Sequence, residues 1–168
     1  QGSMPALPIV SPARDEREVT FGLRDISPAG TQFTINRRKM FIRGTLECCV
    51  FPKTGHPPMD VADWKRVIRI AKSCGLNLLR FHSYCPPEAA FEAADELGMY
   101  FQIETCWANQ STTIGDGKPV DKWVYRETSR ILKAYGHHPS FILMPYGNEP
   151  RGKHAQACRT RKARGQPI

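Results

Sequence analysis

Residues 77–104 read NLLRFHSYCPPEAAFEAADELGMYFQIE. The apolar runs at the two ends of this stretch, residues 77–82 and 99–104, have the composition of buried strands. Between them, Pro86-Pro87-Glu88 suits the first turn of a helix, which continues through Phe91 and Leu97 and ends at Gly98. A strand–helix–strand unit of this kind is typical of proteins with a parallel α/β sheet.

The same alternation extends to both sides of this stretch. Further strands are predicted at residues 41–45 and 141–146. One helix is predicted to begin after Asp60 and to end at Gly75, and another to cover residues 120–135. The inward face of the latter is expected to carry Val120, Trp123, Val124, Ile131 and Leu132.

The chain before residue 41 has a different character. Residues 31–35 and 39–42 flank a polar turn, Asn36-Arg37-Arg38, and predict a β-hairpin that leads into the first strand. Residues 5–30 are rich in proline and charge, with only residues 19–23 resembling a strand. Gln1-Gly2-Ser3 has the appearance of a scar from a cleaved expression tag.

Polar side chains follow three of the predicted strands. Arg80 and His82 lie at the end of one strand, Glu104 at the end of the next, and Asn148 and Glu149 after the last. The carboxyl ends of parallel strands are where such proteins bind ligands. An unpaired buried charge costs several kcal/mol, roughly, so these groups need partners. Either a catalytic site or a structural cluster of salt bridges meets that requirement.

Residues 138–150 carry the most specific signal. They read HPSFILMPYGNEP and resemble the family 2 glycoside hydrolases, whose fourth barrel strand opens with His-Pro-Ser and closes with Gly-Asn-Glu. Residues 33–44, 77–84 and 92–104 are similar to the entry into that family's barrel, its second strand, and its second helix with the third strand. The resemblance covers about residues 19 to 150, in order and with plausible spacing.

The resemblance implies a fold and a domain organisation. The fold is an α/β partial (β/α)8 TIM barrel of about four βα units, preceded by a β-hairpin. Residues 31–150 would form the first half of a glycoside hydrolase barrel. Residues 1–30 would be the tag scar with a linker or the remnant of a preceding β-sandwich domain, and residues 151–168 a basic, disordered tail.

The resemblance also implies roles for single residues. Glu149 would give a proton to the departing sugar oxygen and then activate water as a base. Asn148 would hydrogen-bond the sugar 2-hydroxyl, and Arg80 would orient neighbouring carboxylates. The sugar subsite would be lined by His82, Glu104 and Trp107. The structural alternative for Asn148 and Glu149 is a cap and a solvated charge in a loop.

A retaining glycosidase needs a second carboxylate, about 5 to 5.5 Å from the first. In the family this nucleophile is a glutamate on the seventh strand, which the sequence does not reach. We therefore expect a β-galactosidase-like, retaining O-glycosyl hydrolase that is truncated and that alone has little or no activity. The alternative is a non-catalytic half barrel that serves as a sugar-binding or oligomerising module.

Charge and composition limit the partners. Hydrophobic residues make up 40% of the sequence and charged residues 24%, which is ordinary for a globular protein. The net charge is +8, but residues 151–168 supply six cations without an acid, so nucleic-acid binding by the folded part is not expected. Carbohydrate is the expected partner, and no stretch of eighteen apolar residues predicts a membrane span.

The sequence predicts no cofactor and no metal, because the six cysteines include no Cys-x-x-Cys pair and no histidine at zinc-ligand spacing. Most cysteines are expected to be buried thiols. The alternative is that Cys48, Cys85 and Cys106, each just past a predicted strand, approach one another in space. No segment of the given sequence has the charged start and apolar run of a signal peptide. Because a native secretion signal could have been removed, periplasmic, secreted and cytoplasmic locations all stay open. Because a barrel with four strands has open edges, we expect a homodimer through these edges. The competing expectation is a monomer in which the hairpin or the helices cover the sheet.

Overall fold

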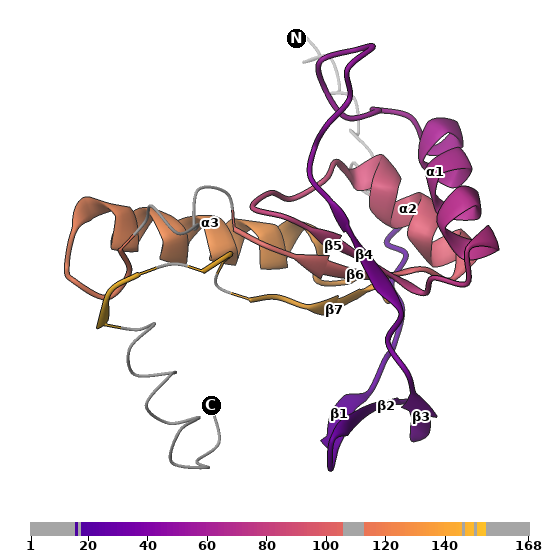
Figure 1. Cartoon of the computed structure of the whole chain (residues 1–168), viewed down its shortest axis with the longest axis horizontal. Helices are drawn as coiled ribbons and strands as arrows, with labels where there is room; N and C mark the ends of the chain where they lie inside the picture. The colour runs from indigo at the N-terminus through magenta and orange to yellow at the C-terminus, as the bar shows by residue number, and fades with distance from the viewer. Residues whose placement is uncertain (1–15, 17, 106–112, 146, 150, 154–168) are drawn as a thin grey trace, which may run out of the picture.

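The computed structural model describes residues 16, 18–105, 113–145, 147–149 and 151–153. They form a mixed α/β structure with one parallel sheet of four strands and one antiparallel sheet of three strands (Figure 1). The α/β class predicted from the sequence is confirmed. Among the described residues, no helix combines the length and the apolar character that a bilayer crossing requires.

The parallel sheet contains the four strands that the sequence predicts. They are β4 (Gly44–Glu47), β5 (Leu78–Phe81), β6 (Tyr100–Ile103) and β7 (Phe141–Leu143), in the spatial order β4-β5-β6-β7. Each strand thus lies beside its neighbour in sequence, and their carboxyl ends meet at one edge of the sheet. This arrangement brings the polar residues that follow the strands together.

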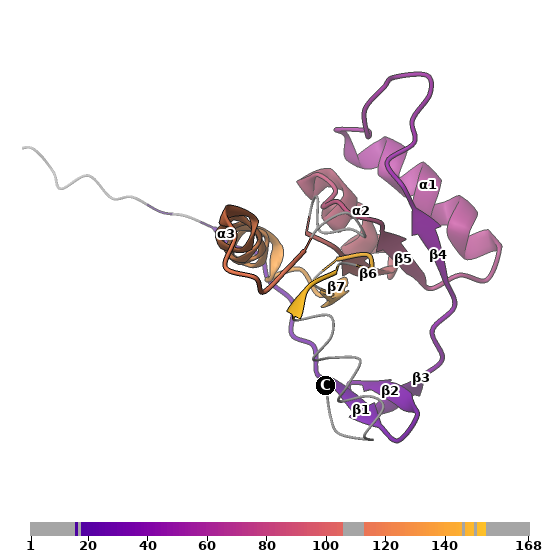
Figure 2. The ribbon, with the colours of Figure 1, turned by 60° about the vertical axis from the view of Figure 1, so that its left-hand side comes forward.

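Three helices connect and follow these strands, with ends that agree with the local sequence signals. Helix α1 (Val61–Ser73) begins after Asp60, whose Oδ1 accepts the Asp63 N–H at 2.8 Å. Helix α2 (Glu88–Leu97) ends at Gly98, which has a left-handed φ of 69°. Helix α3 spans Pro119–Tyr135. In Figures 1 and 2, α1 and α2 lie side by side over the sheet.

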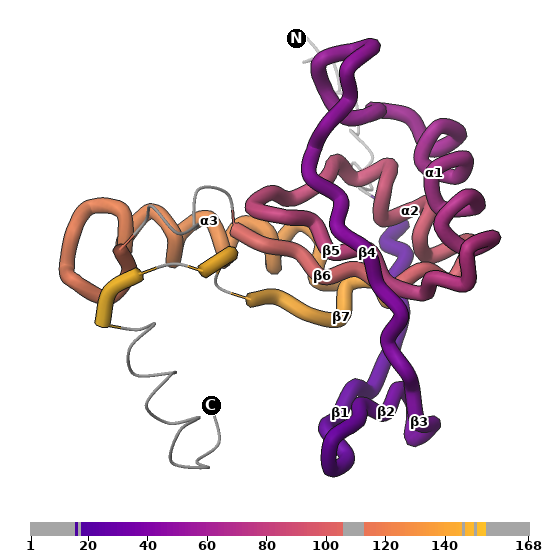
Figure 3. Tube along the Cα trace, in the orientation of Figure 1, coloured from indigo at the N-terminus to yellow at the C-terminus, as the bar shows by residue number. Residues whose placement is uncertain are grey.

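The antiparallel sheet consists of β1 (Ile26–Ala29), β2 (Gln32–Ile35) and β3 (Arg38–Met40). Asn36 and Arg37 connect β2 to β3 with φ values of 50° and 66°, as a two-residue hairpin turn requires. The tube in Figure 3 shows the chain leaving β3 and running directly into β4. The predicted hairpin is therefore present, and it forms a small sheet separate from the parallel one (Figure 2).

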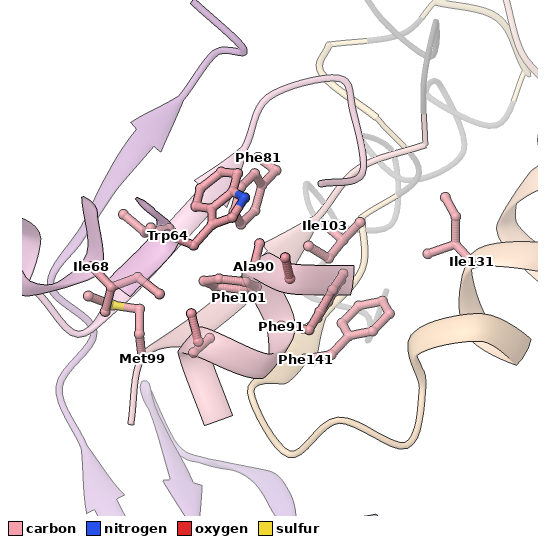
Figure 4. Packing of buried hydrophobic residues seen from close by; sticks show 14 residues of the cluster. Trp64, Ile68, Phe81, Ala90, Phe91, Met99, Phe101, Ile103, Ile131 and Phe141 are labelled. Atoms are coloured by element: carbon pink, nitrogen blue, oxygen red, sulfur yellow. The ribbon is translucent and has the colours of Figure 1, made fainter. Parts of the chain in front are cut away.

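The hydrophobic core lies between the parallel sheet and the helices. Trp64 and Ile68 from α1 and Phe91 from α2 are completely buried there, against Phe81 of β5 and Phe101 of β6 (Figure 4). Neighbouring aromatic rings meet edge to face, with ring centroids 4.7 Å apart for Phe81 and Phe101. Because side chains alternate along a strand, Arg80 and Gln102 point away from the side that carries Phe81 and Phe101.

Some sequence expectations are wrong in detail. The first parallel strand begins at Gly44, not at residue 41, because the Asn77 side chain holds the Arg43 N–H and the Phe41 carbonyl outside the ladder. Residues 19–23 form no strand, whereas residues 26–29, expected to lie in a segment rich in proline and charge, form strand β1. Leu132 was placed on the inward face of α3 but is about half exposed.

The cysteines also differ from the expectation of buried thiols. Cys48, Cys49 and Cys74 are exposed, because they lie past the ends of β4 and α1 rather than within the packed elements. Cys85 is half-buried. Cys106 and Cys158 lie outside the described residues.

Candidate functional site

Arg80 joins two of the predicted site residues at the carboxyl edge of the sheet. Its Nε and Nη2 atoms lie 2.7 and 2.6 Å from Oε1 of Glu104, and Nη2 also donates to Oδ1 of Asn148 at 2.9 Å. Nε therefore donates to Glu104 and Nη2 donates to Asn148, while the close approach of Nη2 to Oε1 is an ion-pair contact. Three strands that are far apart in sequence thus contribute to one hydrogen-bonded network.

Glu104 is the buried centre of this network. The residue has no exposed surface, and its second oxygen, Oε2, accepts the backbone N–H of Ser83 at 2.8 Å. Ser83 has a φ of 60°, a left-handed conformation that is strained for a residue with a side chain. Both Glu104 oxygens are therefore engaged by the protein. Glu104 supports Arg80 and does not present a free oxygen to a sugar, which differs from the expected subsite role.

The contact with Arg80 fixes which way the Asn148 amide faces. A guanidinium group can only donate hydrogen bonds, so the amide atom 2.9 Å from Nη2 has to be the oxygen. The amide nitrogen, Nδ2, then becomes the group that is available for a ligand. Asn148 is half-buried, and at this position it can offer two N–H donors to a hydroxyl oxygen.

Glu149 follows Asn148 directly and is exposed. Its φ of 50° lies in the left-handed region, in which a glutamate is uncommon. Non-glycine residues in this conformation cluster at functional sites, where the surrounding structure holds them in place. An exposed carboxyl group can exchange protons with a ligand as a general acid or base.

His82 lies at the same edge, one residue past β5. Its backbone N–H donates to the Glu47 carbonyl at 2.9 Å, and its Nδ1 is 3.4 Å from the Ser83 hydroxyl. The side chain is half-buried, with one ring nitrogen occupied by this local contact. Trp107, the remaining predicted subsite residue, lies outside the described residues.

Glu47 ends β4 and adds a carboxyl group to this part of the structure. Burial raises its pKa, and the backbone N–H of Cys49, which donates to the carboxylate, partly offsets that effect. In the ladder, however, Glu47 is paired with Phe81, whose side chain points toward the helices. Glu47 therefore belongs to the opposite side of the sheet from Arg80.

The described residues contain no group of three or more His, Cys, Asp or Glu side chains that could hold a metal ion. The sequence pattern does not indicate one participant, Ser83, whose N–H holds Glu104. Glu47, a charged residue just past the predicted strand 41–45, lies on the opposite side of the sheet and is not part of the network. Ser83 acts through its backbone N–H, which a sequence pattern does not reveal.

The known proteins that resemble this chain include glycosidases. No protein-family model matches the chain. A β-galactosidase of Arthrobacter sp. (strain B7) is 25% identical over 149 residues, which is 83% of this chain and 14% of that relative. The chain therefore spans about a seventh of the length of this curated relative.

Solved structures of glycosidases also resemble this chain over a small part of their own length. The β-glucuronidase of Parabacteroides merdae matches with a TM-score of 0.65 and 26% identity, over 77% of this chain and 16% of that protein. A glycosyl hydrolase family 2 member from Bacteroides cellulosilyticus matches with a TM-score of 0.62 and 25% identity, over 77% of this chain and 17% of that protein.

Proposed function

The chain is a relative of the family 2 glycoside hydrolases, and on that premise we propose that it forms part of a glycosidase catalytic domain with Glu149 as general acid/base. The observation that carries the proposal is the network at the carboxyl edge of the sheet. There, Arg80 links the buried Glu104 to Asn148, the residue directly before Glu149. A network of this kind holds the Asn-Glu pair at the edge where parallel α/β proteins bind ligands.

In the proposed reaction, Glu149 protonates the departing glycosidic oxygen and then removes a proton from the water that completes hydrolysis. Asn148 uses Nδ2 to donate to the oxygen of the sugar 2-hydroxyl. His82, at the same edge, and Trp107 would line the sugar subsite. The named relatives are a β-galactosidase and a β-glucuronidase, which together support a β-linked sugar as the substrate. The β-galactosidase supports the β-galactoside type.

We further propose that the four parallel strands are the first half of a (β/α)8 barrel, formed by residues 31–150. Residues 1–30 would belong to a linker or a preceding β-sandwich domain. A retaining reaction then requires a nucleophile from outside this chain, because Glu104 is held by Arg80 and Ser83. Glu47 does not replace it, since it lies on the opposite side of the sheet from Arg80. Turnover by this chain alone is accordingly expected to be low or absent.

Sugar binding tests the proposal without requiring turnover. We expect isopropyl β-thiogalactoside to bind the wild-type chain, and Asn148→Ala to weaken its affinity by about five- to tenfold, the value of one neutral hydrogen bond. Chemical-shift titration gives both dissociation constants. Glu96→Gln is the matched control, because Glu96 lies on α2, away from this edge. Absence of binding, or equal affinity of the wild type and Asn148→Ala, would refute the proposed function.

A second candidate, the oligomerising half barrel, is favoured by the edges of the sheet. Within the part of the chain that the structure describes, strands β4 and β7 each pair on one side only, and Leu46 of β4 is 52% exposed. Such edges favour pairing with another chain. We therefore expect a homodimer, and light scattering at micromolar concentration should give about twice the 19.0 kDa chain mass. A soluble 19.0 kDa species would contradict this expectation.

A further inference from the structure

We propose that a backbone contact between Gly152 and Ile114 is a second anchor that fixes the direction of Glu149, which makes Gly152 a positioning residue. The proposal rests on the proposed function, because it concerns the residue assigned as the acid/base. It assigns residues 113–117 and 151–152 a supporting role in the candidate site.

The need for a second anchor follows from the backbone around Glu149. Gly147, Glu149 and Gly152 all have positive φ values, of 142°, 50° and 102°. Conformations of this kind cost of order 1–3 kcal/mol for a residue with a side chain, and they persist only where the surroundings enforce them. Arg80 holds this segment on one side through Asn148. Holding Glu149 in its strained conformation requires a constraint on the other side as well.

Residues 151 and 152 provide such a constraint through their backbone contacts with residues 113 and 114. Arg151 forms a parallel β-bridge with Thr113, and the Arg151 carbonyl accepts the Ile114 N–H at 2.8 Å. The next residue, Gly152, lies directly against the same backbone. A Cβ atom at Gly152 would be 2.5 Å from the Ile114 carbonyl oxygen and 2.7 Å from the Ile114 nitrogen. Because these are backbone atoms, an alanine side chain at residue 152 does not fit without movement of the loop.

The loop that receives Gly152 is itself held firmly. The Ile114 side chain is buried beside Val124 of α3. The Asp121 carboxylate, at the start of α3, accepts the N–H groups of Gly115 at 2.9 Å and Gly117 at 2.7 Å. Residues 113–117 therefore form a rigid support, and their contact with Gly152 transmits that rigidity to the segment that carries Glu149.

The sequence expectation for the last residues changes accordingly. Residues 151–168 were expected to form a disordered tail, unrelated to the fold. Residues 151 and 152 instead form backbone contacts with residues 113 and 114, while residues 154–168 lie outside the described residues. We assign residues 151 and 152 to the site and not to the tail.

Alanine substitutions at two glycines separate positioning from backbone strain. Gly152→Ala introduces both an unfavourable φ and a clash with the backbone of Ile114. Gly55→Ala introduces only an unfavourable φ. Gly55 has a φ of 73°, and no atom lies within 4 Å of the position that a methyl group would take. If the Gly152→Ala chain does not fold, Asp121→Asn provides a second variant. It removes one of the two acceptors that hold Gly115 and Gly117.

The first measurement needs no sugar. We expect the backbone ¹⁵N order parameter of Glu149 to be about 0.85 in the wild type and in Gly55→Ala, and to fall below about 0.6 in Gly152→Ala. Hydrogen exchange of the Ile114 amide should accelerate in the same variant. An order parameter that is high and equal in all three proteins would overturn the proposal, whatever the chain binds.

The second measurement reports on the carboxyl group itself. N-bromoacetyl-β-galactosylamine alkylates a nearby carboxylate, which forms an ester and releases bromide. We expect Gly152→Ala to slow labelling of Glu149 about tenfold, because displacement by about 1 Å lowers such rates strongly, while the affinity for isopropyl β-thiogalactoside stays within about twofold. Unchanged labelling would overturn the positioning role. Failure of the wild type to bind sugar would instead refute the proposed function and leave the order parameter to decide this inference.

Discussion

Replacement of Arg80 by methionine should destabilise the chain by about 3 kcal/mol or more at pH 7. The physical reason is Glu104, which has no exposed surface and whose Oε1 accepts from Arg80. Removing one member of a buried ion pair leaves the other charge without compensation, and this costs about 3–5 kcal/mol. Asn148 loses its partner at the same time. Urea unfolding followed by tryptophan fluorescence gives the free energy of unfolding.

Two further variants identify the cause. Lys65→Met removes an ion pair of the same type, but its partner Glu96 has a side chain that is 56% exposed, so the cost should stay below about 1 kcal/mol. The double variant Arg80→Met/Glu104→Leu should recover much of the lost stability, because an apolar pair replaces an isolated charge. Equal losses for Arg80→Met and Lys65→Met would show that the buried network contributes little to the fold.

The sequence predicted the helix ends well because those signals are local. Asp60 caps α1 with its own carboxylate, and Gly98 ends α2 in the left-handed conformation that glycine adopts easily. The start of β4 was missed because it depends on Asn77, which lies far along the chain, beyond α1, and binds the backbone of residues 41 and 43. A contact between distant segments leaves no periodic signal in either of them.

The same difference between local signals and contacts of distant segments applies to the candidate site. Arg80 and Glu104 were placed at one edge from the strand pattern, and the register of β5 against β6 does bring them into contact. The burial of Glu104 could not be predicted, since it requires the N–H of Ser83 in a strained conformation. The support from Gly152 was also hidden, because the sequence changes character after residue 150. A glycine there carries no indication of the backbone that packs against it.

A large loss of stability is also expected from a substitution in the hydrophobic core beneath the candidate site. Ile68→Ala should lower the free energy of unfolding by about 2–5 kcal/mol, because Ile68 is fully buried and the variant leaves a cavity. Ile70 provides the control, since it is the same residue type in the same helix, two positions away, and is 56% exposed. Ile70→Ala has the same effect on helix propensity without a cavity, and it should change stability by about 0.5 kcal/mol at most. Urea unfolding of the two variants measures the difference, and equal losses would mean that α1 does not pack on the parallel sheet through Ile68.

The same substitution should also affect the candidate site, because the packing of Ile68 holds β5 and β5 carries Arg80. We expect Ile68→Ala to reduce the protection of the Ser83 amide from hydrogen exchange, whereas Ile70→Ala should leave this protection unchanged.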